Sequence, residues 1–257
     1  MRPFEIVAHR GVHHSLPENS LAAFEQAVNL GADAIEFDVR LNADRIPFVY
    51  HYYYLDDFST LSGPIFQRTA AELDSARLVT ANGHTLTDEH IPRLVDVLDH
   101  FAGRISLEIE IKGPEPESAS VIAEVLEDYR WYWDSFETTS YEPLLLQELR
   151  RRCPGLAADL LFPRPEPWMK ADVTAYTALQ RARQVGARAV HLHPSQLTES
   201  VVKTIQSSSI VIHSWDVNTP EALQKTWELG ISRIDTDQPE QALDFRRKVR
   251  YEPKSIS

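Results

Sequence analysis

Short apolar runs alternate with longer amphipathic stretches along most of the chain. Runs of about four to eight apolar residues bounded by turn residues are typical of buried β-strands. The first two cover residues 4–11 and 34–39. Six more follow, at residues 106–112, 135–141, 157–162, 188–193, 209–217 and 231–237. The pattern predicts eight strands of one sheet.

The segments between these strands carry apolar residues at helical spacing. In the first, Leu21, Phe24 and Val28 share one side of a helix that we expect Asn19 to cap and Gly31 to end. Six further helices are expected, at residues 92–101, 116–129, 142–151, 174–186, 198–207 and 219–230. Alternating strands and helices indicate an α/β protein with a parallel sheet, and eight such strands match a TIM (β/α)8 barrel. No linker or change of composition divides residues 1–257, so we expect a single domain.

One apolar run does not fit this alternation. It begins at Pro47, only a few residues after the second strand, and a parallel crossover needs about a dozen residues. The link is therefore predicted to be a β-hairpin extension. With a turn near residues 43–44, Arg40 is expected to pair with Pro47 and Glu36 to lie opposite His51.

The segment after this hairpin, residues 53–91, has weaker periodicity. It contains turn-like residues at Ser62-Gly63-Pro64 and at Asn82-Gly83. We expect an irregular excursion over the mouth of the barrel that contributes to a pocket wall.

Charge and cysteine content limit the partners. The formal net charge is −12, which argues against nucleic acid or stable membrane association, because both favour a basic surface. The basic run at residues 246–250 is expected to be a solvated tail, and no apolar run approaches the roughly 20 residues of a membrane span. The sequence passes almost at once into a strand pattern, so we expect no signal peptide, and Cys153 is its single cysteine. A cytoplasmic location fits both observations.

Acidic residues gather where the predicted strands end. Glu36 and Asp38 lie two apart on the second strand and therefore share a face, as do Glu108, Glu110 and Lys112 on the next. In a TIM barrel these carboxyl ends form the active-site face. Unneutralised carboxylates are costly to bury together, so a counter-charge is required.

Two arrangements could supply this counter-charge. Lys112 and Arg10 could form a structural ion-pair cluster with the acids. Alternatively, Glu36, Asp38 and Glu110 could hold one divalent cation, Mg²⁺ or Ca²⁺, since both prefer oxygen ligands. Composition alone leaves both open.

Two histidines favour a catalytic interpretation. His9 ends the first strand, and the hairpin is expected to return His51 to the same acids. Imidazole titrates near neutral pH, so one histidine can take up a proton while the other releases one.

These motifs resemble the glycerophosphodiester phosphodiesterase family. The opening segments "VAHRG", "PENSLAAFEQAVNLGAD" and "IEFDVRL" match the family signature nearly position by position. "VYHYYYLDD" resembles its second histidine block and "LEIEIKG" its Glu-x-Lys strand, while "HSWDVN" and "IDTDQP" resemble its last two strand motifs. The resemblance covers residues 5 to 240.

The resemblance implies roles for individual residues. It assigns the metal to the carboxylates of Glu36, Asp38 and Glu110. It assigns the acid/base chemistry to His9 and His51. It assigns substrate binding to the cations Arg10 and Lys112 and to the aromatic residue Trp215. The implied reaction is metal-dependent hydrolysis of a small phosphodiester to glycerol 3-phosphate and an alcohol. Two alternatives stay open: a lysophospholipase D-like or cyclising reaction on lysolipids, and a barrel that binds a phosphodiester without turnover.

Two residues depart from the family pattern. Tyr52 stands where the family usually has Asp after the second histidine, and Arg45 replaces the glycine of the hairpin turn. The run Tyr52–Tyr54 is expected to pack on the hairpin and the excursion, with contact to the alcohol of the substrate as the alternative. Four further predictions concern histidines: His13 lies in a loop, and His191, His193 and His213 form hydrogen bonds inside the barrel.

Overall fold

Eight parallel strands close a barrel, as the sequence predicts. The computed structural model describes residues 4–80 and 85–251. Strand β1 pairs with both β2 and β9, which closes the ring in the order β1-β2-β4-β5-β6-β7-β8-β9. The strands are β1 (Glu5–His9), β2 (Ala34–Leu41), β4 (Ser106–Ile111), β5 (Phe136–Ser140), β6 (Ala157–Leu161), β7 (Ala189–Leu192), β8 (Val211–Ser214) and β9 (Arg233–Thr236).

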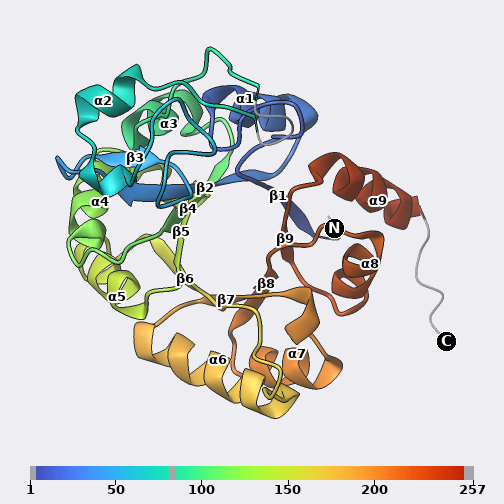
Figure 1. Cartoon of the computed structure of the whole chain (residues 1–257). Helices are drawn as coiled ribbons and strands as arrows, with labels where there is room; N and C mark the ends of the chain where they lie inside the picture. The colour runs from blue at the N-terminus through green and yellow to red at the C-terminus, as the bar shows by residue number, and fades with distance from the viewer. Residues whose placement is uncertain (1–3, 81–84, 252–257) are drawn as a thin grey trace.

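Helices surround this barrel (Figure 1). Their apolar faces pack against the outward-facing strand residues in one continuous core. They are α1 (Leu21–Leu30), α3 (Leu94–Phe101), α4 (Ser118–Glu127), α5 (Pro143–Arg152), α6 (Ala171–Val185), α7 (Glu199–Gln206), α8 (Pro220–Glu228) and α9 (Pro239–Tyr251). Two short 3₁₀ turns, η2 (Arg130–Ser135) and η3 (Pro194–Gln196), complete the ring. Among the described residues, none of the helices has the length and apolar character needed to cross a membrane.

The start of α1 differs from the prediction by one residue. Ser20 is the N-cap, and its hydroxyl accepts a hydrogen bond from the Ala23 amide at 3.1 Å. Asn19 lies one position earlier with a positive φ of 56°, so its side chain is turned into the barrel. The predicted end at Gly31 is confirmed: Gly31 has a φ of 83° and caps the last turn.

The hairpin is present, but its register is shifted by one residue. Strand β3 (Pro47–Val49) runs antiparallel to β2, and Pro47 pairs with Leu41 rather than with Arg40. The Asn42 side chain sets this register, because its Oδ1 accepts hydrogen bonds from the amides of residues 44 and 46. Strand β3 ends before His51, so the predicted pairing of His51 with Glu36 is wrong.

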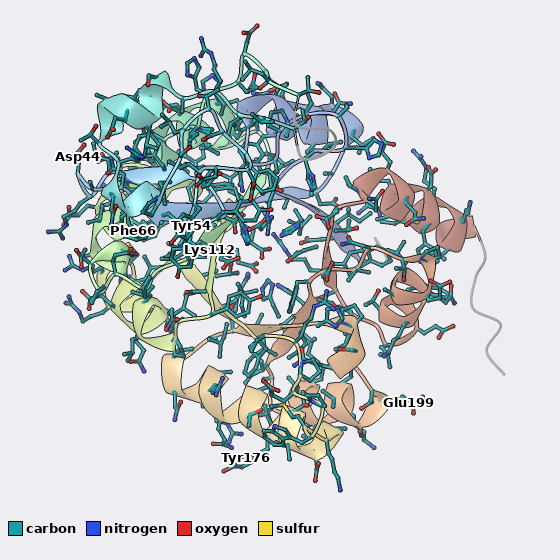
Figure 2. The ribbon with its side chains drawn as sticks, viewed as in Figure 1. Asp44, Tyr54, Phe66, Lys112, Tyr176 and Glu199 are labelled. Atoms are coloured by element: carbon teal, nitrogen blue, oxygen red, sulfur yellow. The ribbon has the colours of Figure 1, made fainter. Side chains whose placement is uncertain are left out.

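The excursion has a small core of its own. It contains the 3₁₀ turn η1 (Ile65–Gln67) and the short helix α2 (Ala70–Ser75), with irregular chain around them. Figure 2 shows Tyr54 and Phe66 of this segment on the same side of the barrel as Lys112. The predicted turn at Asn82-Gly83 lies outside the described residues. The buried residues of this core are Phe48, Tyr50, Leu55, Ile65, Ala70, Leu73, Ala76, Leu78 and Ile91.

The basic run near the C-terminus is not a solvated tail. It belongs to α9, where Arg246 is buried and donates a hydrogen bond to the Phe4 carbonyl oxygen at 3.0 Å. Arg246 also pairs with Asp33. The segment therefore ties the end of the chain to the start of β1, which composition alone could not reveal.

Candidate active site

Three carboxylates meet at one end of the barrel. Glu36 and Asp38 lie on β2, and Asp38 is level with Glu110 on the neighbouring strand β4. All three residues are buried, and each offers one oxygen within 4.8 Å of the others. Burial and the neighbouring carboxylates raise the pKa of Glu36 well above its usual value, and the pKa of Glu110 is raised by burial. The structure thus brings together the three acids that the sequence suggested as metal ligands.

Asp38 lies at the centre of this cluster. Lys112 Nζ lies 3.2 Å from one of its oxygens, and Arg10 Nε lies 3.1 Å from the other. Asn19 donates a further hydrogen bond to that second oxygen at 2.8 Å. Burial alone would raise the pKa of Asp38, but the charges of Lys112 and Arg10 outweigh it and hold the pKa well below its usual value. Asp38 is therefore ionised at neutral pH.

Glu36 is less well neutralised. Its Oε2 accepts the backbone N–H of Arg10 at 3.1 Å. Its Oε1 is buried and has no hydrogen-bond partner among residues 4–80 and 85–251. A buried carboxylate oxygen without a partner is unfavourable unless a proton or a cation is bound there.

His9 is held by an aspartate that the sequence analysis did not single out. His9 ends β1, and its Nδ1 donates to Asp237 Oδ1 at 2.6 Å, while its Nε2 lies 3.8 Å from Glu36. His13 and Asn218 also donate to the Asp237 carboxylate, at 3.2 Å and 2.6 Å. Burial opposes ionisation of Asp237, but the hydrogen bonds from His13 and His9 hold its pKa far below the usual range. The available signal was that Asp237 directly follows a strand, as Arg10 and Lys112 do.

His51 approaches the cluster from the chain after β3. Burial lowers the pKa of His51 to about 3, although the charge of Asp38 acts in the opposite direction. Its Nδ1 is buried, and no described residue offers it a hydrogen bond. The ring of Tyr52 lies edge-on to the imidazole, with centroids 4.5 Å apart. His51 is therefore a neutral imidazole that lies between the Tyr52 ring and the charged groups of the cluster.

Aromatic residues form the opposite wall. Trp215 follows β8, and its ring contacts those of Tyr141 and His193 edge-on, at centroid distances of 6.4 Å and 5.2 Å. Burial and the charges of Glu110 and Asp38 raise the pKa of Tyr141, which places its hydroxyl in the field of the acids. The sequence analysis included Trp215 but missed Tyr141, which follows β5 without a recognisable motif.

Comparison with known proteins agrees with this geometry. Residues 9–241 match the model of the glycerophosphoryl diester phosphodiesterase family. The chain belongs to this family. It is accordingly a phosphoric diester hydrolase.

Relatives cover the same length of chain. Glycerophosphodiester phosphodiesterases of Caldanaerobacter subterraneus and Bacillus altitudinis are 27% and 25% identical, over 95% and 96% of this chain and 98% and 99% of theirs. Among solved structures, the Agrobacterium tumefaciens enzyme has a TM-score of 0.77 at 22% identity, covering 94% of this chain and 99% of that one. An Oleispira antarctica phosphodiesterase in complex with sn-glycerol-3-phosphate has a TM-score of 0.79 at 23% identity, covering 93% and 96%. These structural likenesses confirm the TIM-barrel fold.

The two departures from the pattern of this family have clear structural consequences. Arg45 adopts a positive φ of 61°, the conformation that glycine would adopt more easily in the same turn. Tyr52 stacks on Phe58 of the excursion, with centroids 4.3 Å apart and rings nearly parallel. The expected packing of Tyr52 is therefore confirmed. Tyr53 packs under the guanidinium of Arg40, at 3.9 Å.

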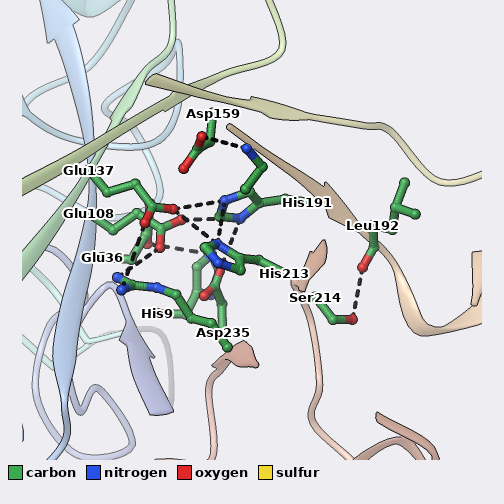
Figure 3. A network of polar contacts seen from close by, with 12 residues as sticks. His9, Glu36, Glu108, Glu137, Asp159, His191, Leu192, His213, Ser214 and Asp235 are labelled. Atoms are coloured by element: carbon green, nitrogen blue, oxygen red, sulfur yellow. Dashed lines mark hydrogen bonds and ion pairs between the residues drawn. The ribbon is translucent and has the colours of Figure 1, made fainter. Parts of the chain in front are cut away.

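Glu18 and the histidines outside the proposed acid/base pair can now be placed within this phosphodiesterase. Glu18 pairs with Arg10 at 3.1 Å and so holds a cation of the site in place. His191 and His213 form hydrogen bonds inside the barrel, as expected (Figure 3). His193 does not, because its Nδ1 bonds to Ser195 at the rim.

Glu108 faces the same interior as Glu110 but lies one layer deeper. Its Oε1 is 3.4 Å from Nδ1 of His191, and it does not join the three acids at the mouth.

Proposed function

We propose that this phosphodiesterase hydrolyses glycerophosphodiesters to glycerol 3-phosphate and an alcohol, using one divalent cation, Mg²⁺ or Ca²⁺. The proposed ligands are Glu36, Asp38 and Glu110. The observation that supports a cation is the buried Oε1 of Glu36, which lacks a hydrogen-bond partner in the described part of the chain. An all-oxygen donor set of carboxylates suits hard cations of this kind.

The charges around the cluster also favour a further cation, because the three carboxylates outnumber the two cationic side chains that pair with them among the residues the structure describes. Arg10 and Lys112 both pair with Asp38, and Lys112 also contacts Glu110 at 2.8 Å. When bound, the ion would supply a Lewis acid that stabilises negative charge on the phosphoryl oxygens.

Arg10 and Lys112 are proposed to bind the phosphate. Both cations lie beside the carboxylates at the barrel mouth, and Glu18 keeps Arg10 in place. Their fixed positive charges would stabilise the transition state, in which negative charge builds on the phosphoryl group.

His9 and His51 are proposed as the acid/base pair, with different roles. His51 is neutral at pH 7, because burial lowers its pKa to about 3, so its imidazole has a free lone pair that can accept a proton from the attacking water. The low pKa makes it a weak base until the negative charge of a bound phosphodiester lies beside it and raises that pKa. The Asp237 carboxylate accepts from Nδ1 of His9 and orients the ring, so that Nε2 is the nitrogen left to face the site. His9 therefore suits the acid that protonates the leaving alkoxide through Nε2.

The glycerol part of the substrate is supported by a solved relative bound to sn-glycerol-3-phosphate. A lysolipid substrate is the second candidate, because Tyr53 and Tyr54 are 45% and 63% exposed beside His51 in the chain and offer apolar surface. Activity on lysolipids in preference to short glycerophosphodiesters would favour this second candidate.

Activity against a panel of glycerophosphodiesters, with and without EDTA, tests the proposal. We expect hydrolysis that EDTA abolishes, that Mg²⁺ or Ca²⁺ restores, and that His51→Ala lowers by about 10²–10⁴-fold. Binding of the phosphodiester without turnover, despite bound metal, would instead indicate a non-catalytic barrel. A single domain, a cytoplasmic location and the absence of nucleic-acid partners stay predictions from the sequence.

A further inference from the structure

A second polar cluster lies inside the barrel, apart from the three acids at the mouth. Glu137 on β5, His191 on β7 and His213 on β8 are buried and point toward one another (Figure 3). Glu137 Oε1 lies 2.9 Å from His191 Nε2 and 3.2 Å from His213 Nδ1, and these two nitrogens are 3.2 Å apart. The three atoms form a nearly equilateral triangle.

This triangle has the size of a metal site. Zinc binds histidine nitrogen at about 2.0–2.1 Å and carboxylate oxygen at about 2.0–2.2 Å. Ligand atoms at such distances from a common ion are separated by roughly 3 Å, as these three atoms are. The donor set of two imidazoles and one carboxylate favours Zn²⁺ over the hard cations expected at the mouth.

Buried carboxylates outnumber guanidinium groups around this triangle. Four buried carboxylates face this region: Glu108, Glu137, Asp159 and Asp235. In the described residues, two guanidinium groups pair with them, those of Arg188 and Arg233. Four negative and two positive charges leave a deficit of two, which one divalent cation or two protons would fill. In the ion-free protein His191 can hold one of these protons, because the charge of Glu108 outweighs burial and keeps the pKa of His191 well above its usual value.

The outer contacts orient the three donor atoms. His191 Nδ1 faces two carboxylates, at 3.4 Å from Glu108 and 3.7 Å from Asp235. A carboxylate behind the far nitrogen is the usual support of a metal-binding histidine. Glu137 Oε2 is bonded to Arg188, which leaves Oε1 to face the two imidazoles.

We propose that Glu137, His191 and His213 bind a Zn²⁺ ion inside the barrel, with a water molecule as the fourth ligand of a tetrahedral site. This ion is distinct from the Mg²⁺ or Ca²⁺ proposed at the mouth, and it joins β5, β7 and β8. Asp159 supports the site rather than coordinating it, because its two oxygens accept from the Ala189 amide and from Arg188.

Cobalt substitution in two matched variants tests this site. His213→Gln removes one interior ligand but keeps a polar side chain, while Glu110→Gln removes a ligand at the mouth. Stripped protein is titrated with Co²⁺ and then with Zn²⁺, and folding is checked by far-UV circular dichroism. We expect visible d–d absorption in the wild type and in Glu110→Gln but not in His213→Gln. The Zn²⁺ affinity of His213→Gln should fall by at least about 100-fold, since even outer-shell losses cost roughly 10–100-fold.

Two results would overturn the proposal. One is Co²⁺ absorption that is unchanged in His213→Gln or lost in Glu110→Gln. The other result applies if His213→Gln does not fold. X-ray absorption of Zn²⁺-loaded Glu110→Gln protein is then measured, and we expect two imidazole ligands. An all-oxygen ligand shell would exclude the site. In either case the two protons, and not an ion, balance the interior charge.

Discussion

Asp237 Oδ1 lies 2.6 Å from Nδ1 of His9, although the two residues are 228 positions apart in the sequence. The contact joins the end of β1 to the end of its neighbour β9, and so fixes the imidazole at the barrel mouth. Because Nδ1 is occupied by this contact, Nε2 is the nitrogen of His9 that remains available to a substrate.

Asp237→Asn should therefore impair catalysis while leaving the fold intact. An asparagine can donate to Nδ1 and so favours the wrong tautomer of His9. We expect kcat to fall by about 10²–10⁴-fold, with a changed pH–rate profile and an unchanged circular dichroism spectrum. His13→Gln is the control, because His13 contacts the same carboxylate and is not proposed to transfer protons. Wild-type kcat in Asp237→Asn would contradict the role given to this contact.

Glu36→Gln should change stability in opposite directions with and without the divalent ion. The folded-state pKa of Glu36 is raised well above its usual value, chiefly by burial. The folded ion-free protein thus keeps a proton that the unfolded chain loses, so this residue makes stability fall as pH rises above about 4.5.

At pH 7 the ion-free Glu36→Gln variant should consequently melt at a higher temperature than ion-free wild type. In saturating Mg²⁺ or Ca²⁺ the order should reverse, because the ion binds the folded wild type and stabilises it. Melting curves at pH 5 and pH 7, with EDTA or with ion, measure both effects. The same order of melting temperatures in both conditions would argue against an ion at Glu36.

Asn19→Ala should destabilise the protein through the buried Asp38. It removes the 2.8 Å hydrogen bond to that carboxylate and places alanine at a φ of 56°. We expect a loss of about 3 kcal/mol in the free energy of unfolding, from a charged hydrogen bond and backbone strain together. Asn19→Gly is the matched control, because it loses the bond without the strain and should cost about 1 kcal/mol less. Urea unfolding measures both, and equal losses would exclude the strain.

Gly11→Ala should be more disruptive than Gly31→Ala. Both glycines have positive φ, at 80° and 83°. A Cβ on Gly11 would lie 2.7 Å from the backbone of Ala23, whereas nothing lies within 4 Å of one on Gly31. Gly31→Ala should cost about 1 kcal/mol of strain, and Gly11→Ala about 3 kcal/mol or more, because helix α1 must also move. Equal melting temperatures for the two variants would contradict this close approach.

Local sequence patterns were sufficient to predict the barrel and most of the residues at its mouth. Periodicity located all eight parallel strands, and the positions of acidic residues near strand ends correctly predicted that Glu36, Asp38 and Glu110 lie together. Errors arose where a single side chain decided between neighbouring positions. Asn42 shifted the hairpin register by one residue, and Ser20 took the cap expected at Asn19.

The sequence by itself determined the family, the parallel barrel and the acids that share one face of a strand, because these depend on spacing along a strand or helix. Only the tertiary structure decided which partners each charge has. Asp237 reaches His9, and Glu137 meets His191 and His213, because strands distant in the sequence become neighbours when the barrel closes. Contacts between such strands depend on closure and stagger of the whole sheet, which spacing within one segment does not specify.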